Sequence, residues 1–162
     1  MSSQAKCESA QDHRDQAGGA PPRYTGSCHC GSVRYQVDTE ITRVIDCNCS
    51  ICRKKGVLSL RVKPEQFRLL SGEDQLGTYR FGTGLARHHF CTVCGIHTFS
   101  RPRAAPDQYT INVRTIDEPA LDLDALERVP FDGLHWEQSV AALHAMMGDA
   151  QPPSSEPPAL AD

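Results

Sequence analysis

The sequence predicts a mainly β domain. Apolar and polar residues alternate in several short segments that are rich in β-branched and aromatic side chains, and this alternation is typical of half-buried strands. Turn-forming residues separate these segments, as at Gly72-Glu73-Asp74 and Pro106-Asp107. The clearest strand patterns are 33–37, 57–62, 75–81 and 109–113.

Only the end of the folded region has a helical pattern. Apolar residues recur there at spacings of roughly three and four, which predicts one amphipathic helix that packs on the core. These residues are Leu134, Trp136, Val140, Leu143 and Met147.

Polar, proline-rich composition marks both ends of the chain. Residues 1–22 are almost free of apolar side chains, and 148–162 contain four prolines, so we expect a disordered tail at each end. The folded domain is predicted to span 23–147. Cys7 falls in the first tail, where we expect a free thiol without a role.

Charge and hydropathy exclude several classes of protein. The net charge is −3 over 162 residues, so no basic surface for nucleic acid is expected. No apolar run approaches the ~18 residues of a membrane span. The N-terminus lacks the apolar segment of a secretory signal, so we expect a cytoplasmic protein. Because the cytosol keeps thiols reduced, the eight cysteines favour metal binding over disulfides.

Three thiols lie within six residues in Asp46-Cys47-Asn48-Cys49-Ser50-Ile51-Cys52. Thiolates bind zinc at about 2.3 Å, and this short turn can bring all three sulfurs around one ion. Three protein ligands and one open position are typical of a catalytic zinc. Arg53, Lys54 and Lys55 follow directly. They can offset the negative charge of the site or bind the carboxylates of a substrate, or they can simply form a solvated turn.

Two further cysteine pairs each precede a glycine, in Cys28-His29-Cys30-Gly31 and Cys91-Thr92-Val93-Cys94-Gly95. If Cys47, Cys49 and Cys52 bind one ion, four thiols remain for a closed structural site. Spacing alone leaves mixed pairings open.

The two predicted sites differ in what they contribute. A structural zinc supplies ~10–16 kcal/mol in small peptides, comparable to the stability of a whole domain. The closed site should therefore hold the fold together, whereas the three-cysteine site retains a position for a ligand. We expect two zinc ions per chain, one structural and one labile.

Three motifs in order, GxCxCGxVxY, DCNCSICRKK and HHFCTVCG, resemble the glutathione-dependent formaldehyde-activating enzyme family, which includes centromere protein V. The later segment FDGLHW, 131–136, resembles that family's F-[DN]-G-x-x-W. The resemblance covers about 24–140 and implies a β-rich, Mss4-like (β-tent) fold with two zinc ions. It also implies that the structural site comprises Cys28, Cys30, Cys91 and Cys94, and that glutathione is captured at the catalytic site of Cys47, Cys49 and Cys52.

One position departs from the formaldehyde-activating enzymes. They resemble C-H-C-x-x-C at the second site, whereas Asn48 occupies the middle position here, as in the form more like centromere protein V. The cysteines are retained, but the departure bears on the substrate.

The histidines near the cysteine turns have two interpretations. His29, His88 and His97 can orient a sulfur or complete the open zinc site, or they can lie around the sites and on the surface without binding metal. No role is predicted for His13 or His144.

Two functions therefore remain. The first is a zinc-dependent carbon–sulfur lyase, or thiol-adduct synthase, that combines glutathione with formaldehyde or another small aldehyde to give adducts of the S-hydroxymethyl type. The second is a zinc-stabilised protein-binding module of the centromere protein V type, without catalysis. The open zinc site favours the enzyme. Asn48, which departs from the pattern of the formaldehyde-activating enzymes, leaves the binding-module interpretation open. Neither nucleic acid nor a membrane is an expected partner, and the oligomeric state is undetermined.

Overall fold

The structure is a computed structural model, and it describes residues 22–117 and 121–147. The predicted tails at 1–22 and 148–162 lie outside the described residues, apart from Pro22. Cys7 and His13 lie outside them as well, as do the side chains of Leu143, His144 and Met147. None of the helices within the described ranges has the length and apolar character that crossing a membrane requires.

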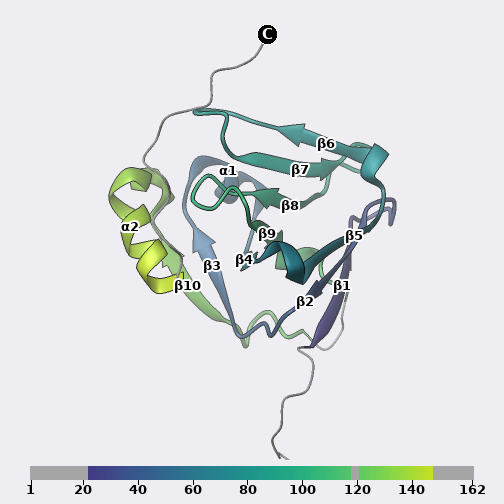
Figure 1. Cartoon of the computed structure of the whole chain (residues 1–162), viewed down its shortest axis with the longest axis horizontal. Coiled ribbons are helices and arrows are strands. Elements are labelled where there is room, and N and C mark those ends of the chain that lie inside the picture. Colours follow the sequence, from purple (N-terminus) through teal and green to yellow (C-terminus); the bar gives the residue numbers. More distant parts are fainter. Residues whose placement is uncertain (1–21, 118–120, 148–162) are drawn as a thin grey trace, which may run out of the picture.

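Two β-sheets make up the domain (Figure 1), which confirms the mainly β prediction. The smaller sheet has the strand order β1-β2-β5, and both of its pairings are antiparallel. Its strands are β1 (Arg23–Ser27), β2 (Arg34–Asp38) and β5 (Phe67–Ser71).

The larger sheet has the strand order β10-β3-β4-β9-β8-β7-β6. All of its pairings are antiparallel except the one between β10 and β3. Its strands are β3 (Arg43–Cys47), β4 (Ser59–Val62), β6 (Leu76–Tyr79), β7 (Arg87–Cys91), β8 (His97–Arg101), β9 (Tyr109–Asn112) and β10 (Glu127–Phe131).

The parallel pair β3 and β10 places two distant segments at one edge of the sheet. Cys47, the last residue of β3, lies opposite Phe131, the last residue of β10. Because the carboxyl ends of parallel strands meet at the same edge, the segments that follow both strands are neighbours. The amide of Asn48 donates to the carbonyl of Phe131 at 3.1 Å and continues this pairing past the strands.

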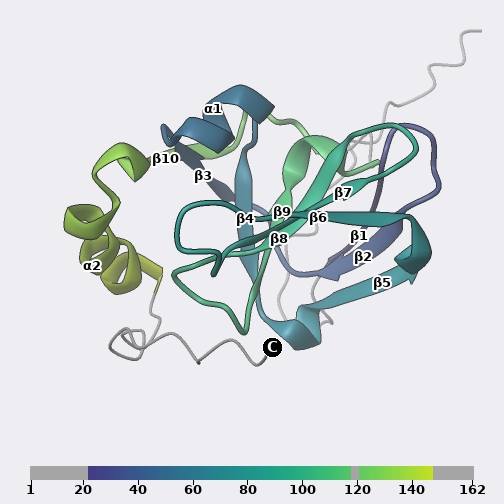
Figure 2. The same ribbon diagram turned by 90° about the horizontal axis from the view of Figure 1, so that it is seen from above.

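Helices are short and lie at the edges of the sheets (Figure 2). α1 (Ser50–Lys55) follows β3, and α2 (Trp136–Met147) follows β10. Single 3₁₀ turns occupy Pro64–Gln66, Glu73–Gln75, Val113–Thr115 and Gly133–His135.

The predicted C-terminal helix exists, but its predicted role in the core is wrong for the part that the structure describes. No described residue of α2 belongs to either hydrophobic cluster, and Leu134 lies before the helix with 57% of its surface exposed. Trp136 and Val140 are half-buried. The helix therefore covers the side of the sheet near β10 instead of filling the interior.

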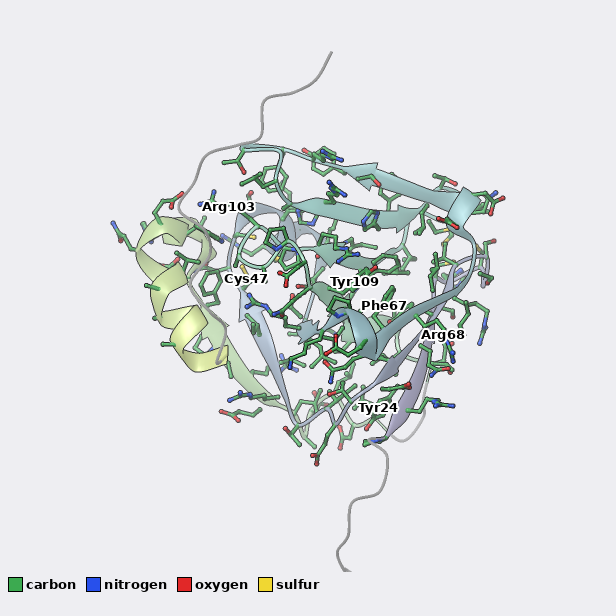
Figure 3. All side chains as sticks on the ribbon, viewed as in Figure 1. Tyr24, Cys47, Phe67, Arg68, Arg103 and Tyr109 are labelled. Atoms are coloured by element: carbon green, nitrogen blue, oxygen red, sulfur yellow. The ribbon has the colours of Figure 1, made fainter. Side chains whose placement is uncertain are left out.

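The main hydrophobic core lies between the two sheets. Tyr35 of β2 stacks on Phe67 with ring centroids 5.9 Å apart, and Phe67 contacts Phe99 of β8 and Tyr109 of β9 at 4.8 and 4.1 Å. Figure 3 shows Phe67 and Tyr109 side by side in the middle of the molecule. Such aromatic contacts add to the stabilisation from buried apolar area. A second cluster consists of Ile41, Val44, Leu58, Val113 and Leu126.

Candidate metal centres and adjoining cavity

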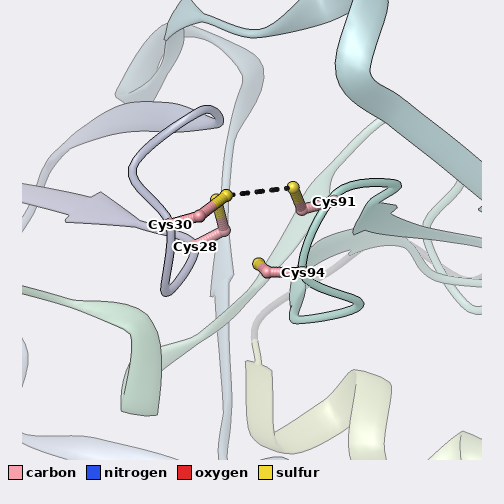
Figure 4. A group of neighbouring side chains, drawn as sticks. All are labelled: Cys28, Cys30, Cys91 and Cys94. Carbon is pink, nitrogen blue, oxygen red and sulfur yellow. Dashed lines mark hydrogen bonds between the residues drawn. The ribbon is translucent and has the colours of Figure 1, made fainter.

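Four cysteine sulfurs converge where the two sheets meet (Figure 4). Cys28 and Cys30 come from the turn between β1 and β2, whereas Cys91 ends β7 and Cys94 lies in the turn between β7 and β8. All four sulfurs lie within 4.8 Å of one another. The Sγ atoms of Cys28 and Cys30 are 3.5 Å apart, and those of Cys30 and Cys91 are 3.7 Å apart. Sulfurs bound tetrahedrally at about 2.3 Å from zinc are about 3.8 Å apart, so this group fits the ion.

The two turns share one backbone conformation. Gly31 and Gly95, each directly after the second cysteine of its pair, both have φ +77°, which a residue with a Cβ rarely adopts. This bend aims backbone amides at the sulfurs: Val33 N donates to Cys28 Sγ at 3.3 Å, and a bond from the Ile96 backbone is the main cause that lowers the pKa of Cys94. The glycines thus favour the thiolate form that zinc binds.

The four-cysteine cluster is buried on one side, whereas Cys30 is exposed and Cys94 is half-buried. Cys28 and Cys91 are buried and belong to the main hydrophobic core, and burial raises the pKa of Cys91 to about 11. A buried thiol does not ionise readily without a cation nearby, so a bound metal ion would stabilise the thiolate form of these cysteines. The cluster also joins one sheet to the other, which is the position of a structural cross-link.

Cys47, Cys49 and Cys52 form a second group of three sulfurs, all within 4.8 Å of one another. Cys47 ends β3, Cys49 directly precedes α1 and Cys52 lies within α1. No fourth cysteine, histidine or carboxylate among the described residues brings a ligand atom within that distance of all three sulfurs. The three-cysteine site therefore has the donor set of an open zinc site.

The three thiols strongly perturb one another. Hydrogen bonds from Cys47 and Cys52, and from backbone amides of α1, lower the pKa of Cys49 to about 2. The bond to Cys49 raises the pKa of Cys47 to about 11, and bonds to Cys47 and Cys49 also raise the pKa of Cys52. Without a cation, one negative charge at this site disfavours the next; a divalent cation would allow all three thiolates.

The segment after β10 covers the three-cysteine site. A Cβ at Gly133 would lie 2.6 Å from Cys47 Sγ and 2.7 Å from Cys49 Cβ, so a larger residue would displace this cover. Asn48 fastens it: its side-chain amide donates to Asp132 at 2.9 Å, and its side-chain oxygen accepts from Leu134 N at 3.0 Å. The residue that departs from the C-H-C pattern thus links the cysteine turn to the FDGLHW segment.

Asp132 is the centre of this linkage. Its carboxylate also contacts His135 Nδ1 at 2.7 Å, and hydrogen bonds first from Asn48 and then from His135 lower the pKa of Asp132 to about 2. Asp132 also accepts from the amide of His135, as the residue before a helical turn commonly does. The same carboxylate therefore starts the 3₁₀ turn and holds it against Asn48.

Replacing Asn48 with alanine is expected to loosen the cover without unfolding the domain, because neither hydrogen bond is buried in a core cluster. Trp136 is the single tryptophan of the chain and directly follows the cover, so its fluorescence reports the change. We expect a red-shifted emission and faster quenching by iodide, with a melting temperature within a few degrees of the wild type. Asn48→His, the residue of the C-H-C form, tests whether an imidazole can hold the same segment. An unchanged Trp136 signal in Asn48→Ala would contradict this role of Asn48.

A cavity of about 360 Å³ adjoins the three-cysteine site. This volume is within the range of small-molecule sites in proteins, and most of the lining is apolar. Figure 3 shows Cys47 and Arg103, two of the lining residues, on the side where α2 lies. The lining also includes Phe81, Gly82 and Ala86 from the β6–β7 connection, Ile45, Val57, Ser100, Phe131, Leu134 and Trp136.

The cations at the cavity only partly match those that the sequence singled out. Lys55 is half-buried and lines the cavity, whereas Arg53 and Lys54 are exposed and do not line it. Arg61 and Arg103, which the motifs did not indicate, also line it. Arg61 lies on a strand and Arg103 in a loop, and neither is part of a sequence motif that would have indicated a place at the cavity.

Arg103 is held in place by α2. Its guanidinium lies 3.4 Å from the ring centroid of Trp136 and pairs with Glu137. A cation over an indole face is a favourable contact. The tryptophan of the FDGLHW segment therefore positions a charged group at the cavity.

The three histidines near the cysteine turns have different surroundings. His29 is exposed, whereas His88 and His97 line the cavity. None of them brings a ring nitrogen into either described sulfur group.

Comparison with known proteins places these sites in a family. Residues 23–128 match the family described as glutathione-dependent formaldehyde-activating enzyme, and this segment contains all seven cysteines of the two sites. A crystal structure of a Rhodobacter sphaeroides protein, a structural-genomics target, is similar to 65% of this chain and to 97% of that protein's chain. The two are 33% identical with a TM-score of 0.59. Since the family match spans more than half of the sequence, the chain belongs to the glutathione-dependent formaldehyde-activating enzyme family.

Proposed function

We propose that the protein is a zinc-dependent thiol-adduct synthase, or carbon–sulfur lyase in the reverse direction, that acts on glutathione and a small aldehyde such as formaldehyde. The observation that carries this proposal is the open three-cysteine site at the edge of a mainly apolar cavity. Membership in the family supports chemistry that involves glutathione and formaldehyde.

Two zinc ions per chain fit the two groups of sulfurs. The ion at Cys28, Cys30, Cys91 and Cys94 would be structural because four thiolates complete its coordination. A zinc at Cys47, Cys49 and Cys52 would supply an open position that favours the thiolate form of a bound thiol. This second ion would be the more labile of the two, since it has one protein ligand fewer.

The overall reaction is an addition without oxidation or reduction. The thiol of glutathione loses its proton, its sulfur forms a bond to the carbonyl carbon, and the C=O double bond becomes a single bond. The oxygen takes up one proton, so thiol and aldehyde together equal the hemithioacetal product. The reverse step breaks the carbon–sulfur bond and returns both reactants.

The protein would contribute orientation and a site shielded from water. Lys55 and Arg103 line the cavity and present positive charge to the carboxylates of glutathione. Gly133 and its neighbours cover the sulfurs, which limits the access of water.

Calorimetry with glutathione tests the proposal directly. We expect saturable binding with release of about one proton, seen as a heat that depends on the buffer, and faster exchange between formaldehyde and its glutathione adduct in NMR exchange spectra. S-Methylglutathione has the same carboxylates but no free thiol and should release no proton. A protein that binds neither compound and leaves the exchange rate unchanged would refute the proposed function.

Replacing Lys55 with methionine should weaken glutathione binding about tenfold, on the order of 1.4 kcal/mol. Methionine keeps much of the apolar stem but removes the half-buried charge at the cavity. Lys54→Met removes an exposed charge from the same helix, and we expect less than a twofold change because exposed charges interact weakly. Calorimetric titrations at two salt concentrations measure both effects. Equal effects of the two substitutions would show that Lys55 makes no specific contact.

A further inference from the structure

Two histidines on the cavity wall have ring nitrogens without hydrogen-bond partners in the described part of the chain. His97 is 8% exposed, and neither of its ring nitrogens has a partner; Nε2 of His88 also lacks one. Leaving a buried polar group without a partner costs free energy, so such groups are rare and call for an explanation. Both histidines line the cavity beside the three-cysteine site.

An irregularity in the larger sheet turns His97 toward this cavity. His89 lies opposite Phe99 across β7 and β8, but the next residue, Phe90, lies opposite His97, so Thr98 is an extra residue on β8. Residues directly opposite in antiparallel strands share a face, so Phe99 and His97 point to opposite faces despite their spacing of two. Phe99 enters the core, and His97 faces the cavity. Bulges often redirect a side chain in this way near active sites.

Both imidazoles are neutral. Burial, followed by the charge of Lys55, lowers the pKa of His97 to about 3 and that of His88 to about 4. A neutral imidazole carries one N–H donor and one nitrogen acceptor. It can therefore donate a hydrogen bond to an oxygen atom that gains negative charge.

The two rings form a compact group. Their centroids are 5.8 Å apart, and Phe81 stacks on His88 at 5.6 Å and fixes its orientation. A role as the fourth zinc ligand is less consistent with the structure, because neither ring brings a nitrogen within 4.8 Å of all three sulfurs of Cys47, Cys49 and Cys52.

We propose that His97, with His88 beside it, forms the site for the carbonyl oxygen of the aldehyde and donates a hydrogen bond to this oxygen while the sulfur adds to the carbonyl carbon. This inference rests on the proposed function and names the catalytic residue for the second substrate. The nitrogens are shielded from water, so an aldehyde oxygen reaches them only after a small displacement of the surrounding side chains, which favours a small, uncharged carbonyl compound.

The hydrogen bond acts on the charge that the addition creates. As the carbon–sulfur bond forms, the electron pair of the C=O π bond moves to oxygen, and the proton given up by the thiol ends on that oxygen. A donor at this position stabilises the developing negative charge, and losing one such donor commonly lowers the rate 10²–10³-fold. In the reverse reaction, the same group stabilises the oxygen while the carbon–sulfur bond breaks.

The test compares His97→Leu with His97→Gln and with the control His89→Leu, using glutathione and formaldehyde in NMR exchange measurements. We expect His97→Leu to slow the catalysed exchange about 100-fold, while glutathione affinity and a content of two zinc ions stay unchanged. His97→Gln keeps an N–H donor and should recover part of the rate. His89 bonds to Thr78 and contacts Phe99 on the other face of β7, so its replacement should change the rate less than twofold.

Thermal unfolding separates a catalytic role from a structural one. Because no described partner is lost, His97→Leu should melt at or above the temperature of the wild type. A rate within twofold of the wild type would overturn this inference alone, and loss of one zinc would instead identify His97 as a ligand and also overturn it. A wild-type protein without glutathione binding or catalysis would remove the proposed function, and this inference with it.

Discussion

Cys91→Ser is expected to abolish cooperative unfolding of the whole domain. Cys91 is fully buried in the main core, and its sulfur faces those of three cysteines that come from both sheets. If these four sulfurs hold a structural zinc, its removal takes away an apparent ~10–16 kcal/mol, as much as the net stability of a typical domain. Circular dichroism during heating, with zinc content by elemental analysis, measures this result.

Cys49→Ser is the matched comparison for that experiment. This variant also removes one sulfur from a group of cysteines, here the three-cysteine site. Cys49, however, belongs to neither core cluster. We expect this variant to unfold cooperatively within a few degrees of the wild type. A Cys91→Ser protein that stays folded with two zinc ions would contradict a structural role of the four-cysteine cluster.

The second large effect concerns function: Cys49→Ser should lose the second zinc and reduce glutathione-dependent proton release below detection. Cys49 has the lowest pKa of the three thiols and accepts bonds from the other two, so its loss leaves two ligands, of which Cys47 raises the pKa of Cys52. Two thiolates hold zinc poorly compared with three or four. Zinc analysis and calorimetry with glutathione measure the two losses.

A mild chelator provides the control for this variant. In the wild type, it should remove the labile zinc first and give the same loss of glutathione binding, and added zinc should restore binding only in the wild type. If Cys49→Ser still released a proton on binding glutathione, the thiol site would lie elsewhere. If it unfolded as completely as Cys91→Ser, both sites would be structural.

Local patterns carried most of the correct predictions. The mainly β class followed from alternating strands, whereas the division of the cysteines into the two groups seen in the structure was implied by the family resemblance, since spacing alone left mixed pairings open. Both turns have a glycine at φ +77° directly after the second cysteine, so the glycines of the two motifs were a local signal of a tight turn around a sulfur. The family resemblance is confirmed by the match over 23–128.

Features that depend on long-range pairing could not be predicted. The parallel pairing of β3 with β10 brings Asn48 to Asp132 across 84 positions, and no local pattern specifies the partner of a strand. The role of Asn48 in holding the cover was hidden for the same reason. The motif could show only that asparagine replaces a histidine.

The direction in which side chains point could not be predicted from the sequence either. Three consecutive cations follow the CxCxxC motif, but a helix distributes its residues around its axis, so only Lys55 reaches the cavity. A core-packing helix was expected from apolar spacing at 134–147, although Trp136 instead contacts Arg103 at the cavity edge. His97 and Phe99 are two residues apart, and side chains at this spacing in a regular strand point to the same face. They point to opposite faces here because of the bulge at Thr98.

The pairing of β3 with β10 also determines when the protein becomes complete during synthesis. The ribosome releases the chain from its N-terminus, so all seven cysteines of both sulfur groups are available once residue 94 has emerged. Zinc could then bind both groups before the strand that carries the cover has emerged. An ion at Cys47, Cys49 and Cys52 would remain open to exchange until β10 docks beside β3. Binding of metal by the cysteines and closure of the site by β10 would thus be separate events in the synthesis of each chain.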